Sequence, residues 1–184
     1  MQEPNPSAAA GVSPQDFGPY GRGLFSVSKW LALVGGALFV VLVAMSIVSI
    51  VGRKLFSAPV PGDVEILQMV AAFASATFFA YCHLNGGDVK VDFFTSRASA
   101  TTTHVLDAMG SCLVGVVGSL ITWRALEGAL SIRAAGETSM ILGWPLWLAQ
   151  ILMVPGFALL ALAGFYLMAL HLQRLGAPAQ GVSA

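Results

Sequence analysis

The chain has 184 residues, of which 57% are hydrophobic and only 10% are charged, and its formal net charge is zero. Because a water-soluble domain carries about 25% charged residues, this composition excludes an ordinary soluble protein and indicates an integral membrane protein. The balanced charge also provides no basic surface for nucleic acid, so we expect no nucleic-acid partner.

The first long apolar run covers residues 31–51 and contains no charge. It is long enough to cross a bilayer and too long for the core of a signal peptide, so we expect a retained span over about 30–52. The preceding segment contains four prolines and four glycines. This composition predicts a disordered tail over residues 1–23.

Three further apolar runs follow, and each is long enough for a membrane helix. The third run ends in charge at Arg124, and the fourth contains Pro155, where we expect a kink. The last ten residues, 175–184, resemble the first tail in composition. The predicted fold is therefore an all-α integral membrane domain over residues 24–174, with four spans in contact with lipid. The three later spans are expected at about 64–84, 105–126 and 144–170.

The segment HLNGGDVKVDFF, residues 83–94, is unusually charged for this chain. Its alternation of polar and apolar residues fits a strand, but the open edges of a strand cannot lie in lipid. As a helix, it would place Asp88 and Asp92 on one side and apolar residues on the other. We therefore expect a turn followed by a short interfacial helix between the second and third spans.

Small residues recur at four-residue spacing in two of the predicted spans. Such stripes allow helix backbones to approach closely, and this packing drives helix association in lipid. They predict either packing within the four-helix unit or a face that docks another membrane protein. The helix-packing residues are Ala72, Ala76 and Ala80 in the second span and Ser111, Gly115 and Ser119 in the third.

The middles of the four apolar runs contain no carboxylate, lysine, arginine or histidine. A protein that itself moves ions or protons usually needs such groups in mid-membrane, so we expect a scaffold, an anchor or a docking subunit. The sequence contains no catalytic, metal-binding or phosphate-binding motif, and we predict no enzyme activity and no cofactor. One alternative stays open, because His83 and His104 could hold a haem b in a membrane anchor of a respiratory oxidoreductase.

The charges of the loops do not determine the orientation, because the two sides of the predicted domain carry five and four basic residues. Glu65, near the start of the second span, allows two interpretations. Its carboxylate would be favoured by the helix dipole there, or it would form a salt bridge with a partner subunit.

Three stretches of the chain together resemble the small membrane subunit (DctQ-like) of tripartite ATP-independent periplasmic (TRAP) transporters. They are GRKLFSAPVPGDVEILQ with Arg53 and Glu65, GGDVKVDFF, and GETSMILGWPLWLAQILMVPGF. Their order and spacing match the family over roughly residues 30–172. Asp88 stands where the family usually has a histidine, so no histidine chemistry can be carried over to that position.

The resemblance implies a role in the bacterial inner membrane, with both termini cytoplasmic. A periplasmic substrate-binding protein would deliver a small organic acid, such as a C4-dicarboxylate or sialic acid, to a large membrane transport subunit coupled to sodium. The small subunit would support this partner. We expect partner contacts at Arg53, Glu65, Asp88 and Asp92. Contacts with the binding protein are expected at Glu127, Arg133 and Glu137.

Overall fold

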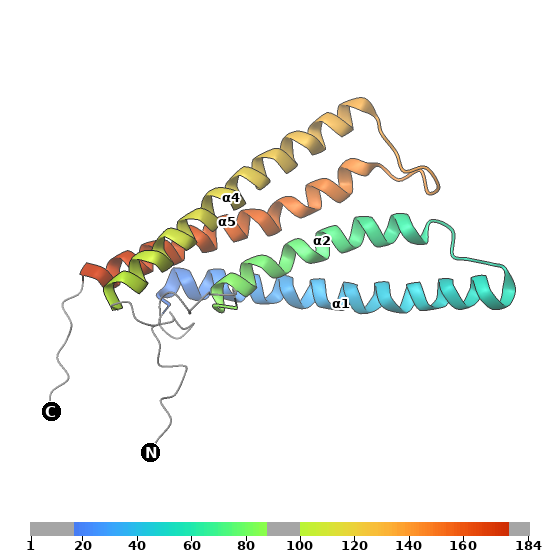
Figure 1. The fold of residues 1–184 in the computed structure, drawn as a ribbon. Helices are drawn as coiled ribbons and strands as arrows, with labels where there is room; N and C mark the ends of the chain where they lie inside the picture. Colours follow the sequence, from blue (N-terminus) through green and yellow to red (C-terminus); the bar gives the residue numbers. More distant parts are fainter. Residues whose placement is uncertain (1–16, 88–99, 177–184) are drawn as a thin grey trace, which may run out of the picture.

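The computed structural model describes residues 17–87 and 100–176 and is built from four long helices (Figure 1). Each helix is long and apolar enough to cross a membrane, which confirms the predicted all-α architecture with four candidate spans in the described part of the chain. The interfacial helix expected near Asp88 and Asp92 lies outside the described residues. The helices are α1 (Pro19–Phe56), α2 (Asp63–Leu84), α4 (Ala100–Ala135) and α5 (Leu146–Gly176).

The largest differences from the expected boundaries are at the start of α1 and at the end of α4. Helix α1 begins at Pro19, so residues 19–23 are helical rather than part of the predicted tail. Proline suits the first position of a helix because its fixed φ is already helical and its missing N–H has no partner there. Helix α4 continues from Arg124, where the third apolar run ends, to Ala135.

The helices pack in the order α1–α2–α5–α4, and among the described residues α1 and α4 make at most weak contact. Figure 1 shows the α4–α5 pair diverging from the α1–α2 pair toward the end that carries the two short connections. We call this end, formed by residues 57–62 and 136–145, the loop end. The helices thus form an open row, which leaves broad apolar faces for lipid or for another protein.

Neighbouring helices approach each other at glycine and alanine. A Cβ atom on Gly156 of α5 would lie 2.7 Å from the carbonyl oxygen of Ala76 in α2. Ala76 and Ala80 are 0% and 1% exposed, whereas Ala72 is only partly buried. This part of the second-span stripe therefore lies inside the four-helix unit.

The third-span stripe packs against α5. Ser111 and Gly115 are buried, and a Cβ on Gly164 would lie only 2.7 Å from the Cα of Gly115. Ser119 is exposed, and its hydroxyl donates to the carbonyl oxygen of Gly115 at 2.8 Å. A hydroxyl bonded within its own helix can face lipid because its polar atoms are satisfied.

Candidate functional site

The loop end is held together by two carboxylates in the first turn of α2. The first, Asp63, accepts hydrogen bonds from the Ser49 hydroxyl at 2.5 Å and from Arg53 Nη2 at 3.0 Å. The backbone N–H of Val60 in turn donates to Ser49 Oγ at 3.3 Å. Asp63 therefore fixes the α1–α2 connection against the last turns of α1.

The α4–α5 connection folds into a tight hairpin over residues 137–145. Thr138 and Pro145 form an isolated antiparallel bridge. The N–H of Ser139 donates to the carbonyl oxygen of Trp144 at 2.8 Å, and the N–H of Trp144 donates to Ser139 Oγ at 3.1 Å. Gly143 takes φ 67°, a left-handed conformation that glycine adopts without steric cost.

The second carboxylate, Glu65, connects this hairpin to α2. Its two oxygens accept the backbone N–H groups of Ile141 at 2.9 Å and Leu142 at 3.1 Å. Gly62 has φ 71°, and a Cβ there would lie 2.6 Å from Cγ of Leu142. We call the contact between the Glu65 carboxylate and these two amides the loop clamp.

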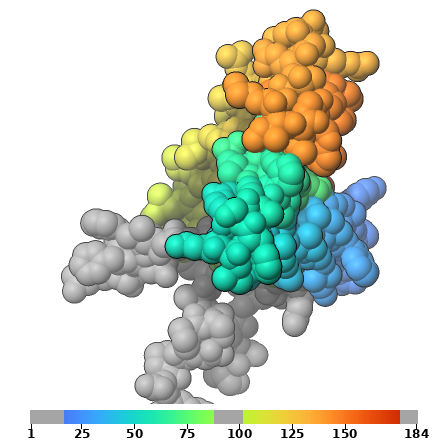
Figure 2. Space-filling view, turned by 90° about the vertical axis from the view of Figure 1, so that its right-hand side faces the viewer, coloured from blue at the N-terminus to red at the C-terminus, as the bar shows by residue number. Residues whose placement is uncertain are grey.

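The loop clamp joins segments that are far apart in sequence. Figure 2 looks onto the loop end and shows the orange α4–α5 segment lying directly against the green start of α2. Hydrogen bonds to an ionised carboxylate are stronger than neutral ones, so the clamp restrains the hairpin. It was absent from the two interpretations of Glu65 drawn from the sequence, because nothing local identifies amide donors so distant along the chain.

The other predicted contact residues do not take part in the loop clamp. Arg53 is 60% exposed while it pairs with Asp63. Glu127 pairs with Arg124 at 3.2 Å on the surface of α4. The Arg133 guanidinium lies over the Trp147 ring, 5.1 Å from its centroid. Glu137 is exposed, and Asp88 and Asp92 lie outside the described residues.

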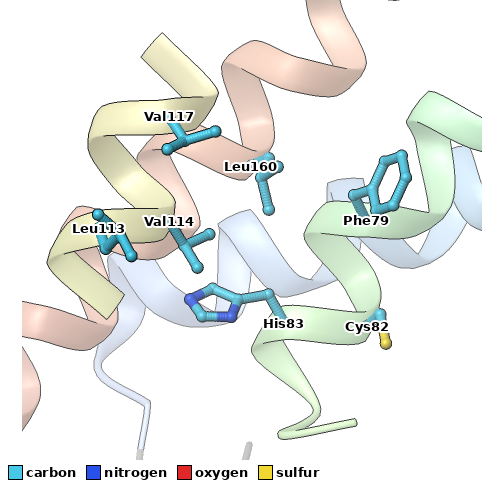
Figure 3. A pocket seen from close by; sticks show the side chains of 7 residues that line it. All are labelled: Phe79, Cys82, His83, Leu113, Val114, Val117 and Leu160. Carbon is cyan, nitrogen blue, oxygen red and sulfur yellow. The ribbon is translucent and has the colours of Figure 1, made fainter. Parts of the chain in front are cut away.

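An apolar groove of about 300 Å³ lies between α2 and α4 near the end opposite the loops (Figure 3). Figure 3 shows the His83 ring pointing into this groove toward Val114, while Cys82 points away. His104 instead packs against His171 of α5, with ring centroids 5.8 Å apart. The groove is lined by Phe79, Cys82, His83, Leu113, Val114, Val117 and Leu160.

Comparison with protein families gives a match to the DctQ component of tripartite ATP-independent periplasmic transporters, over residues 42–174. The chain belongs to the DctQ family. It is therefore a multi-pass membrane component of such a transporter, and the family is one of transporter components rather than enzymes. Comparison with curated proteins and with solved structures found no match.

The DctQ assignment separates the two functions that the sequence left open. The matched region includes α2, the loop clamp, α4 and nearly all of α5. Neither this family nor the contacts of the three histidines supports a haem-binding respiratory anchor. His83 and His104, the proposed ligand pair, face the groove and His171 respectively.

Proposed function

We propose that this DctQ chain is a static support in the bacterial inner membrane for the large, sodium-coupled subunit of a TRAP transporter. It also helps to dock the periplasmic binding protein that delivers a small organic acid. In this arrangement both termini are cytoplasmic, and the loop end faces the periplasm. The chain itself performs no catalysis and needs no cofactor.

The loop clamp is the observation that best supports this role. Any movement of the α4–α5 hairpin away from the start of α2 would have to break this contact. Here Glu65 bonds both Ile141 and Leu142, and Asp63 bonds both Ser49 and Arg53. Charge-assisted bonds in both connections suit a surface that keeps one shape while other subunits move.

The open row of helices provides the second line of support. Large apolar side chains remain exposed along every helix, among them Val41, Phe79, Leu113 and Leu162. A broad apolar face of this kind suits lipid and an obligate membrane partner, since permanent interfaces are more hydrophobic than transient ones. Arg53, Glu65, Asp88 and Asp92 remain our candidates for contact with the large subunit.

The docking of the binding protein is assigned to charged residues near the loop end. Arg133 and Glu137 lie in the last turn of α4 and at the start of the hairpin, and both are exposed. Glu127 was predicted for the same role, but it lies about two turns deeper along α4.

Co-expression with a large TRAP membrane subunit tests the proposed support role. We expect the two chains to remain together through mild detergent extraction and size-exclusion chromatography, as a complex of fixed stoichiometry. A matched preparation in which only the large subunit is expressed serves as the control. Elution of this chain as a separate species, with the large subunit well folded, would contradict the role.

A further inference from the structure

Helix α4 carries an ion pair on its outer surface. Arg124 Nη1 and Glu127 Oε2 are 3.2 Å apart, and the two side chains are 76% and 51% exposed. Because α4 packs mainly on α5, it forms one edge of the helix row. The pair therefore faces away from the rest of the chain.

Contacts between α4 and α5 show how deep this pair lies. A Cβ on Gly118 would lie 2.9 Å from the backbone nitrogen of Ala161, and Gly128 approaches the side chain of Gln150. The two helices run antiparallel, and Arg124 lies between the two glycines. Arg124 is therefore level with the part of α5 around residue 155.

Contacts between α5 and α2 show which part of α2 lies at the same depth as the ion pair. Gly156 packs on Ala76, and the rings of Phe157 and Phe79 stack with centroids 5.8 Å apart. The ion pair is thus level with the middle of α2, about 15 Å from either helix end at a rise of 1.5 Å per residue. In Figure 1 the yellow part of α4 lies on the other side of α5 from the middle of α2.

The α1–α2 pair indicates where the bilayer lies. Helix α2 has 22 residues, a length of about 33 Å that matches the hydrocarbon core. The uncharged residues 31–51 of α1 lie alongside it, since Ser49 bonds Asp63 and Gly35 approaches the Ala74 carbonyl. With these two helices spanning the core, the ion pair on α4 lies near mid-membrane.

Charged side chains at this depth almost always face protein or a water-filled cavity, because exposing them to hydrocarbon is costly. We propose that the α4 face carrying Arg124 and Glu127 is covered by the large membrane subunit, whose polar groups complete the hydrogen bonding of the pair. The partner must supply acceptors, since a guanidinium has five N–H donors and Glu127 engages it from one side only. This inference rests on the proposed function and assigns one face of the chain to that partner.

The same face includes exposed residues at helical spacing on both sides of the pair. Leu120 lies one turn before Arg124, and Ser131 lies one turn after Glu127, and both are exposed. A cross-linker placed at either position would report what covers the face without altering the ion pair.

The first experiment neutralises each charge in the co-expressed complex. We expect Arg124→Gln and Glu127→Gln each to lower recovery of the large subunit about tenfold or more, because each leaves the other charge unpaired in the interface. Lys54→Gln, which removes an exposed charge at the end of α1, should leave recovery unchanged. Equal recovery of the large subunit with all three variants would contradict the proposal.

The second experiment keeps both charges. Leu120→Cys, made in a Cys82→Ala, Cys112→Ala background and carrying a benzophenone, should cross-link to the large subunit within the assembled transporter. Adducts with lipid alone would overturn the proposal. So would strong labelling of Leu120→Cys by a membrane-impermeant maleimide both with and without the large subunit, since that result places the ion pair in water rather than in a protein interface. If the unmodified chain fails to bind the large subunit at all, the proposed function fails first.

Discussion

Replacing Gly164 with alanine should separate α4 from α5 and destabilise the protein by about 1–3 kcal/mol, the usual cost of overpacking a close contact. A Cβ at this position would lie 2.7 Å from the Cα of Gly115 and 2.8 Å from the carbonyl oxygen of Ser111. Both are backbone atoms, so no side chain can rotate away to accommodate the methyl group. Thermal unfolding of the purified chain in detergent, followed by circular dichroism, measures the effect.

Gly110→Ala provides the matched control on the facing helix. A Cβ on Gly110 meets no atom within 4 Å, and alanine is the better helix former. This variant should therefore be as stable as the unmodified chain or slightly more stable. If Gly164→Ala melted at the same temperature as Gly110→Ala, α4 and α5 would not approach as closely as the structure shows.

Replacing Glu65 with glutamine should loosen the α4–α5 hairpin. Glutamine keeps one acceptor oxygen, but its NH₂ group would face one of the two backbone N–H groups that the carboxylate now binds, from Ile141 and Leu142. We expect chymotrypsin to cleave the hairpin after Met140 or Leu142 several-fold faster in the isolated variant. Mass spectrometry of the fragments over time measures this rate.

Glu137→Gln is the control for Glu65→Gln because it removes a carboxylate from the hairpin without touching the loop clamp. Glu137 is exposed, and its backbone carbonyl, rather than its side chain, accepts the N–H of Leu146. Cleavage of this variant should match that of the unmodified chain. Should Glu65→Gln resist chymotrypsin equally well while losing the large subunit, Glu65 would act as a partner contact instead of a clamp.

The number and order of the spans could be predicted from sequence because each depends on local length and hydrophobicity. The end of α4 could not be predicted in this way. Charge at Arg124 ends the apolar run, but the following residues, RALEGALSIRAA, include many strong helix formers, and the helix continues to Ala135. The apolar limit of a span and the end of its helix are thus separate properties.

The packing partners of the small-residue stripes were only half predictable. Gly115 was identified by its four-residue spacing, but its counterpart Gly164 was not, since Leu160 interrupts the same spacing between Gly156 and Gly164. The relative depth of the helices also could not be predicted from the sequence. Arg124 borders the third apolar run in the sequence, and only the contacts through Gly118, Gly128 and Gly156 place it level with the middle of α2.

The candidate functional site could likewise be predicted only in part from the sequence. Glu65 at the start of α2 was identified from the sequence, as was the possibility that it has a specific partner. The partner in the structure is a pair of backbone amides 76 and 77 residues away. Backbone donors have no residue-type signature, so a contact of this kind becomes visible only once the chain is folded.

The most direct test of the support role is transport itself. Proteoliposomes containing the large subunit, with the binding protein and a labelled organic acid outside, should show uptake driven by a sodium gradient only when this chain is included. Omitting the gradient provides the background rate. Without this chain, uptake should stay near the background rate. Uptake at the full rate by the large subunit and binding protein alone would rule out the support role.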